Sequence, residues 1–185
     1  MFIQTEPTPN PATLKFLPGQ NVLAQGAIEF RTIESAAASP LAAALLETPG
    51  VESVMFGSDF VSVTKGEVDW PHLKPAVLGL IMEHFSSGAP LLVGAAAQIE
   101  ASGEFYDPAD AETVATIKNL IETRVRPAVA ADGGDIVFKG FRDGIVYLTM
   151  KGACSGCPSS TATLKSGIEK LMRHFVPQVR AVESA

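Results

Sequence analysis

The chain reads Gly152-Ala153-Cys154-Ser155-Gly156-Cys157-Pro158-Ser159-Ser160 between residues 152 and 160, and its interpretation depends on this stretch. The stretch holds the only two cysteines among 185 residues, at the spacing C-x-x-C. Glycines flank the pair, and Pro158 followed by two serines predicts the first turn of a helix. Two thiols at this spacing can bind one metal centre together or close a disulfide on each other. They supply half of a four-ligand metal site.

The residues around the cysteine stretch predict a small α+β module with the loop between a strand and a helix. Apolar residues at helical spacing, turn residues and alternating strands set the expected order α-β-β-α(-β). We expect, in order, a helix from about Asp110 to Pro127, a turn at 130–135, strands at 135–141 and 145–151 joined by a tight turn at 142–144, a helix at 158–175 and a short strand at 179–182.

The first half of the chain predicts a second α+β module. Two prolines, Pro71 and Pro75, are expected in or before the first turn of its long helix, because proline breaks a helix interior. We expect strands at 2–5, 13–16, 22–23, 28–30, 51–56 and 60–64, a helix opened by Ser39-Pro40 and ended by Thr48-Pro49-Gly50, and a helix from Asp69 to about Phe85. The fold class is therefore α+β with two small α+β domains, at 1–87 and 108–185, joined by a linker at 88–107.

Composition and charge restrict the class of protein. A chain of this length buries roughly 70% of its unfolded surface and needs no disulfides, so two cysteines favour a reducing compartment. The longest apolar run, 89–97, is far shorter than the ~20 residues of a membrane-spanning helix, and the N-terminus lacks a signal or transit pattern. Residues 1–108 carry four Lys/Arg and twelve Asp/Glu (net −8), whereas residues 109–185 carry ten and eight (net +2). We therefore expect a cytoplasmic protein that binds neither membrane nor nucleic acid.

The position of the two cysteines at a helix start predicts reactive thiols. Unpaired backbone N–H groups and the positive end of the helix dipole stabilise a thiolate there, and Lys151 and Lys165 are placed to add to this. Thiolates are the form that binds a metal or attacks a disulfide.

A closed zinc or iron–sulfur site requires two more ligands than one chain supplies. His174 lies about 16 residues, or ~24 Å, along the helix that follows the loop, which excludes it within one subunit. His72 and His84 belong to the other domain and are predicted to be surface or half-buried helix residues. The simplest completion is a second copy of the loop, so that Cys154 and Cys157 of two chains give four thiolates. Such a set suits zinc or an iron–sulfur cluster, and ligand count alone does not decide between them.

Thiol–disulfide exchange is the alternative from the enzyme class, since a C-x-x-C pair between a strand and a helix is also the thioredoxin layout. Two features weaken this reading. Ser155 and Gly156 separate the thiols, with proline after the second cysteine, and no βαβ unit precedes the motif.

Two extended motifs resemble those of the Nfu iron–sulfur proteins. Asp132-Gly133-Gly134-Asp135, followed by the run from Lys151 to Lys165, is similar to the NifU-like C-terminal domain of that family. Thr5-Glu6-Pro7-Thr8-Pro9-Asn10-Pro11, with Leu14-Lys15-Phe16-Leu17-Pro18-Gly19, is similar to its Nfu N-terminal domain.

The resemblance implies a non-catalytic scaffold or carrier that binds a 4Fe–4S cluster between subunits, with Cys154 and Cys157 as iron ligands. It implies upstream cluster-assembly proteins and apo iron–sulfur proteins as partners, and a homodimer or higher oligomer in the cluster-bound state. The expected location is the bacterial cytoplasm, or the mitochondrial matrix for a mature eukaryotic form.

Overall fold

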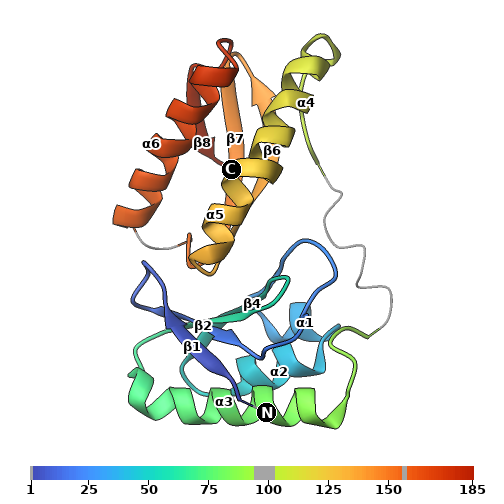
Figure 1. Cartoon of the computed structure of the whole chain (residues 1–185), viewed down its shortest axis with the longest axis vertical. Coiled ribbons are helices and arrows are strands. Elements are labelled where there is room, and N and C mark those ends of the chain that lie inside the picture. The colour runs from blue at the N-terminus through green and yellow to red at the C-terminus, as the bar shows by residue number, and fades with distance from the viewer. Residues whose placement is uncertain (1, 94–102, 156–157) are drawn as a thin grey trace. The chain divides into compact units, whose positions relative to one another are not determined.

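The chain forms two compact α+β units, at residues 1–99 and 100–185, which confirms the predicted fold class. The computed structural model describes the backbone of residues 2–93, 103–155 and 158–185, and the side chains of the same ranges except 158–160 (Figure 1).

The first unit is built on a five-stranded antiparallel sheet in the order β1-β2-β5-β4-β3. Its hairpin between β4 and β5 was predicted, and Val54 pairs with Val63 across it. The strands are β1 (Gln4–Pro7), β2 (Thr13–Leu17), β3 (Ile28–Phe30), β4 (Val51–Phe56) and β5 (Val61–Lys65).

Three helices complete the first unit: α1 (Ile33–Ala36), α2 (Pro40–Glu47) and α3 (Trp70–Ser87). The Ser39 side chain caps α2 by accepting a hydrogen bond from the Ala42 N–H at 3.2 Å, as its sequence predicts. Buried residues of α2 and α3, including Leu41, Leu45 and Ile81, share one core with the sheet. Figure 1 shows these helices gathered on one face of the sheet.

Two expectations for the first unit are wrong, and one helix was missed. Residues 22–23 form no strand; the Val22 N–H instead donates to the Ser58 carbonyl at 2.8 Å, which pins this loop to the β4–β5 turn. The short helix α1 was not predicted, because four residues carry too little periodicity. Pro75 lies inside α3 rather than in its first turn.

The second unit follows the predicted order of elements. Its sheet has the order β6-β7-β8, with β6 antiparallel to β7 and β7 parallel to β8. The elements are a 3-10 turn (Pro108–Asp110), α4 (Ala111–Leu120), a π-helical turn (Ile121–Val125), α5 (Arg126–Ala131), β6 (Gly134–Arg142), β7 (Ile145–Gly152), α6 (Pro158–Phe175) and β8 (Ala181–Ser184). The last strand begins two residues later than predicted.

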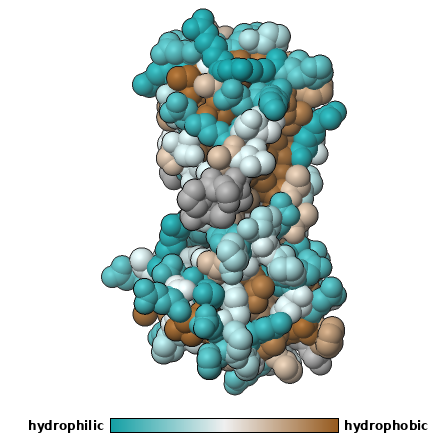
Figure 2. All heavy atoms as spheres, turned by 90° about the vertical axis from the view of Figure 1, so that its left-hand side faces the viewer, coloured by the Kyte–Doolittle hydropathy of each residue, from teal (hydrophilic) through white to brown (hydrophobic). Residues whose placement is uncertain are grey.

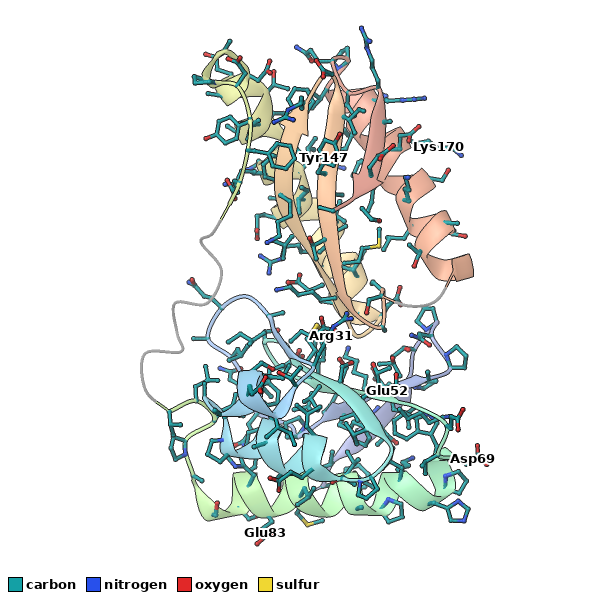
Figure 3. All side chains as sticks on the ribbon, turned by 180° about the vertical axis from the view of Figure 1, so that it is seen from behind. Arg31, Glu52, Asp69, Glu83, Tyr147 and Lys170 are labelled. Atoms are coloured by element: carbon teal, nitrogen blue, oxygen red, sulfur yellow. The ribbon has the colours of Figure 1, made fainter. Side chains whose placement is uncertain are left out.

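The helices of the second unit cover one face of its sheet (Figure 1). Ile117 from α4, Leu148 from β7 and Met172 from α6 are fully buried in the core between them. Tyr147 lies on the opposite face of the sheet, as Figure 3 shows from behind. There its ring packs against Phe105 with centroids 5.2 Å apart.

The helix that opens the second unit does not stop at Pro127 as predicted, but continues to Ala131. The π-helical turn explains this, because it ends at Val125, two residues before Pro127. The Arg126 N–H bonds to the Ile121 carbonyl, five residues back. Pro127 therefore stands in the first turn of α5, where its missing N–H and fixed φ are tolerated.

Both described ends of the predicted linker pack against a unit. Leu91 and Leu92 contact the core of the first unit. Phe105 bonds to β6 through its N–H to the Lys139 carbonyl (3.0 Å), and its ring lies over Gly140, where a Cβ would approach it to 2.5 Å. The predicted boundaries at 1–87, 88–107 and 108–185 stay a prediction, since residues 94–102 lie outside the described part.

The surface of the described residues carries both hydrophobic and hydrophilic side chains. On the face drawn in Figure 2, hydrophobic side chains reach the surface in patches among hydrophilic ones. The large hydrophobic residues most exposed to solvent are Phe2, Ile33, Met82, Val93, Tyr106 and Phe175. None of the described helices combines the length and the apolar character needed to cross a bilayer.

The core of the second unit gives a first test of this packing. Met172→Ala removes a fully buried side chain, so we expect the second unit to lose about 2–5 kcal/mol of stability. Urea unfolding followed by tyrosine signals reports on this unit, because Tyr106 and Tyr147 are the only tyrosines of the chain. Fluorescence of the single tryptophan, Trp70, reports on the first unit and should keep its midpoint. The exposed Lys170→Ala is the control, and an equal loss in both variants would contradict the packing.

Candidate metal-binding site

The cysteine loop begins where β7 ends and leads into α6. Gly152 closes β7 in the left-handed region (φ 61°), and residues 153–155 form a turn. Cys154 is 6% exposed and belongs to the hydrophobic core of the second unit, together with Met150 and Ile168. Cys157 and Gly156 lie outside the described residues, so the ligand prediction for Cys157 has no structural counterpart here.

Hydrogen bonds fix the described part of the loop from three sides. The Ala153 N–H donates to the Gly133 carbonyl at 3.2 Å, which ties the loop to the turn before β6. The Ser155 N–H and hydroxyl both donate to the Gly152 carbonyl, at 3.0 and 2.9 Å. The Thr161 hydroxyl, from the first turns of α6, donates to the Cys154 carbonyl at 3.1 Å.

Gly134 makes room for the Cys154 side chain. A Cβ on Gly134 would lie 2.3 Å from Cys154 Sγ, so that the sulfur would have to move, and 3.0 Å from the Lys151 carbonyl oxygen, which is a tight contact. The Asp-Gly-Gly-Asp turn and the cysteine loop, which are the two parts of the NifU-like motif, are therefore in direct contact. The glycine pair supplies a left-handed turn at Gly133 (φ 76°) and a bare backbone at Gly134, against which the thiol packs.

The Cys154 thiol is protonated in this conformation. Burial, with smaller contributions from the carboxylates of Asp132 and Asp135, raises its pKa to about 12. The raised pKa runs against the expectation that the helix start favours a thiolate at Cys154, and loss of hydration is its largest cause. A metal bound by this sulfur has to displace its proton.

A pair of opposite charges lies beside the loop. Arg126 donates from Nε and Nη2 to the two carboxylate oxygens of Asp135, at 2.8 and 2.9 Å, and from Nη1 to Glu122 at 2.7 Å. Asp135 is buried and pairs across the strands with Lys151, which is buried as well. The hydrogen bonds from Arg126 to Asp135 raise the pKa of the guanidinium. Sequence reasoning missed this pair, although an Arg-Pro step before the Asp-Gly-Gly-Asp turn was its visible signal.

The three histidines lie on two helices, His174 on α6 and both His72 and His84 on α3 of the first unit. His174 stands at the end of α6, exposed, with its ring 4.9 Å from that of Phe175. His84 is buried in α3 beside Phe85, more deeply than expected, and burial lowers its pKa. His72 is exposed in the same helix. Within the described ranges, no three His, Cys, Asp or Glu side chains are grouped closely enough to hold a metal ion.

Two family models match the chain and together cover most of it. The model of the scaffold protein Nfu/NifU N terminal matches residues 3–88, and the model of the NifU-like domain matches residues 117–183. The chain belongs to the Nfu/NifU family. The resemblance carried by the two motifs is thereby confirmed.

Relatives match this family member over almost its whole length. It is 49% identical over 185 residues to a Homo sapiens protein named NFU1 iron-sulfur cluster scaffold homolog, mitochondrial, with 99% of this chain and 71% of that protein covered. It is 52% identical over 186 residues to NifU-like protein 4, mitochondrial, from Arabidopsis thaliana, with 99% and 65% covered. The chain thus spans between 65% and 71% of the lengths of these two relatives.

Among solved structures, the chain is similar to a NifU-like protein from Saccharomyces cerevisiae, determined by NMR. The two are 30% identical, the match covers 50% of this chain and 84% of that one, and the TM-score is 0.45.

The buried thiol gives a pH-dependent prediction. In the metal-free Cys157→Ser variant, Cys154 is the only thiol, and we expect its alkylation by iodoacetamide to be slow and to keep accelerating through about pH 10. In the folded protein the pKa of Cys154 lies above that of an ordinary thiol. The protonated thiol therefore stabilises the fold at pH values below the ordinary thiol pKa, and this contribution to stability fades as the pH rises toward 12. A rate that levels near pH 9, as for an exposed thiol, would contradict the burial.

The contact between Gly134 and Cys154 gives a second prediction. Gly134→Ala forces a methyl group against Sγ, and we expect a loss of about 1–3 kcal/mol together with faster alkylation of Cys154. The matched control is Gly167→Ala in α6, where a Cβ meets nothing within 4 Å and helix propensity gains about 1 kcal/mol. Unchanged Cys154 reactivity in a folded Gly134→Ala protein would refute the contact.

Proposed function

We propose that this family member is an iron–sulfur cluster scaffold and carrier, and that Cys154 and Cys157 of two copies bind a 4Fe–4S cluster between them. The observation that carries the proposal is the match of both halves of the chain to Nfu/NifU domains, with the cysteine pair inside the NifU-like part. A relative named as an iron–sulfur cluster scaffold supports the same role.

The number of ligands supports a shared cluster. One chain offers two cysteines, and an iron–sulfur cluster is held by four thiolates. Within the second unit, His174 cannot complete the set near Cys154, because it stands at the other end of α6. A second copy of the loop supplies the same two thiols again and closes a symmetric site.

A carrier has to release its cluster, and the loop is suited to this. Cys154 is packed against Gly134 and its pKa is raised, so a cluster shared between two copies has to draw the thiol from this contact and displace its proton. Both steps cost free energy and weaken the net affinity of the site. The role is one of binding and delivery to apo iron–sulfur proteins downstream of cluster assembly, without catalysis.

The alternative function is a dithiol–disulfide oxidoreductase. It needs an accessible thiolate as the attacking group. The burial and raised pKa of Cys154 speak against this residue in that role. Reduction of an insulin disulfide by the monomer tests the alternative directly, and rapid turnover would favour it over the carrier.

The place of action follows from the relatives. Those reported above are named as mitochondrial proteins, which favours the mitochondrial matrix among the locations that the sequence left open. Nothing in the comparisons supports the bacterial cytoplasm.

Anaerobic reconstitution with iron and sulfide tests the proposed function. We expect a brown protein with about four iron ions per two chains, migrating as a dimer. Cys154→Ser and Cys157→Ser should each abolish the visible absorption, because a shared site then loses two of its four thiolates. Ser155→Ala, within the same loop, is the control and should keep most of the cluster. A colourless protein that takes up only zinc would contradict the proposal.

A further inference from the structure

Arg126 and Asp135 form a forked ion pair beside the cysteine loop. Two parallel hydrogen bonds of 2.8 and 2.9 Å join the guanidinium to the carboxylate. The Asp135 side chain is 5% exposed, and that of Arg126 is 24% exposed. A bidentate pair with one buried partner fixes both position and orientation, which a single surface contact does not.

The π-helical turn brings Arg126 to this place. One extra residue in a helical turn rotates everything after it by about 100° around the helix axis. The turn at Ile121–Val125 therefore decides which face of the helix Arg126 occupies, and Pro127 directly follows it. Turns of this kind are frequent at functional sites. Here the turn places Arg126 where its guanidinium forms the two hydrogen bonds to Asp135.

Asp135 connects the fork to the metal-binding thiol. It is the second residue of β6 and follows Gly134, whose backbone packs against Cys154 Sγ. The first two residues of β6 pair with the last two of β7. These pairs are Gly134 with Gly152 and Asp135 with Lys151. A shift of Asp135 moves the surface on which the thiol rests.

We propose that Arg126 is a positioning residue for the cluster site, acting through Asp135 and Gly134 on the conformation of the cysteine loop. The inference rests on the proposed function for its importance to cluster binding, but its structural part concerns the metal-free protein alone. The fork also neutralises a carboxylate next to a site that gathers four thiolates, where an unpaired negative charge would repel the cluster.

A purely stabilising ion pair is the competing explanation. Removal of such an ion pair would lower the protection of backbone amides against hydrogen exchange throughout the second unit. A positioning role acts first on the loop. The Ala153 N–H, bonded to the Gly133 carbonyl, reports on the loop, and the Val176 N–H, bonded to the Met172 carbonyl at the end of α6, serves as the reference.

Arg126→Lys is the test variant, because lysine keeps the charge but cannot form the fork. In hydrogen exchange of the metal-free full chain, we expect the Ala153 amide to exchange about tenfold faster, with Val176 unchanged. The matched control is Arg124→Lys on the same π-helical turn, whose guanidinium lies over the Phe175 ring at 4.9 Å and should leave both amides unchanged. Equal acceleration at Ala153 and Val176, or none at either, overturns the proposal.

Cluster release gives the second readout. With reconstituted protein, we expect Arg126→Lys to lose its visible absorption to an iron chelator about tenfold faster than the wild type and Arg124→Lys. Unchanged release in a folded Arg126→Lys protein overturns the role at the cluster.

If Arg126→Lys does not fold, Asp135→Asn is the second variant, because it removes the charge and keeps the shape of the side chain. It is tested by the same hydrogen-exchange and cluster-release measurements. A wild-type chain that binds no cluster refutes the proposed function instead, while the exchange result still decides whether the fork holds the loop.

Discussion

The contact between Cys154 Sγ and the backbone of Gly134 is the constraint around which the second unit is arranged. It requires a residue without a side chain at the start of β6, and the left-handed Gly133 before it turns the chain from α5 into the strand. The pairing of Gly134 with Gly152 then brings β7 to an end beside the same thiol. The two glycine-rich motifs, about twenty residues apart in sequence, are thus two sides of one packing arrangement.

This packing reconciles two demands on a carrier thiol. A thiol that stays exposed and ionised binds metals readily but is open to oxidation and to wrong metals. A thiol that is buried and protonated is protected, and it binds a metal only after it loses its proton. In the proposed carrier, this cost lowers the net affinity for the cluster. A site of this kind holds its cargo more weakly than four preformed thiolates would, which is what transfer to an acceptor requires.

Much of the fold was predictable from the sequence because it depends on local signals. The stripe of α6, the β6–β7 hairpin with its Asp143-Gly144 turn, and the Ser39-Pro40 start of α2 each carry a pattern within a few residues. The continuation of the first helix past Pro127 was not predictable in this way. The residue that follows the π-helical turn, Arg126, bonds to Asp135, a partner nine residues away and in another element, and no local pattern contains this contact.

For the site, the two cysteines stay a prediction from the sequence, and the state expected of Cys154 differs from the one in the structure. The helix start and the nearby lysines suggested an ionised thiol, whereas burial among Met150, Ile168 and their neighbours makes the protonated form the stable one. Burial is a property of the whole unit, and no window of a few residues contains it. The glycines held the missing information, since a residue kept without a side chain at a strand start indicates that another group has to lie against the backbone.

The fork of Arg126 on Asp135 follows from the same constraint. β6 begins with Gly134, directly after Gly133, so little side-chain packing holds the start of the strand, and glycine retains the most backbone freedom in the unfolded chain. Asp135 is the first residue of β6 with a side chain, so it is the earliest point at which the strand can be anchored. An anchor made of one carboxylate needs a partner of fixed geometry, and a guanidinium supplies two parallel hydrogen bonds where an ammonium supplies a single point charge. The need for a bare backbone under Cys154 thereby accounts for the arginine, the π-helical turn that presents it, and the aspartate that it binds.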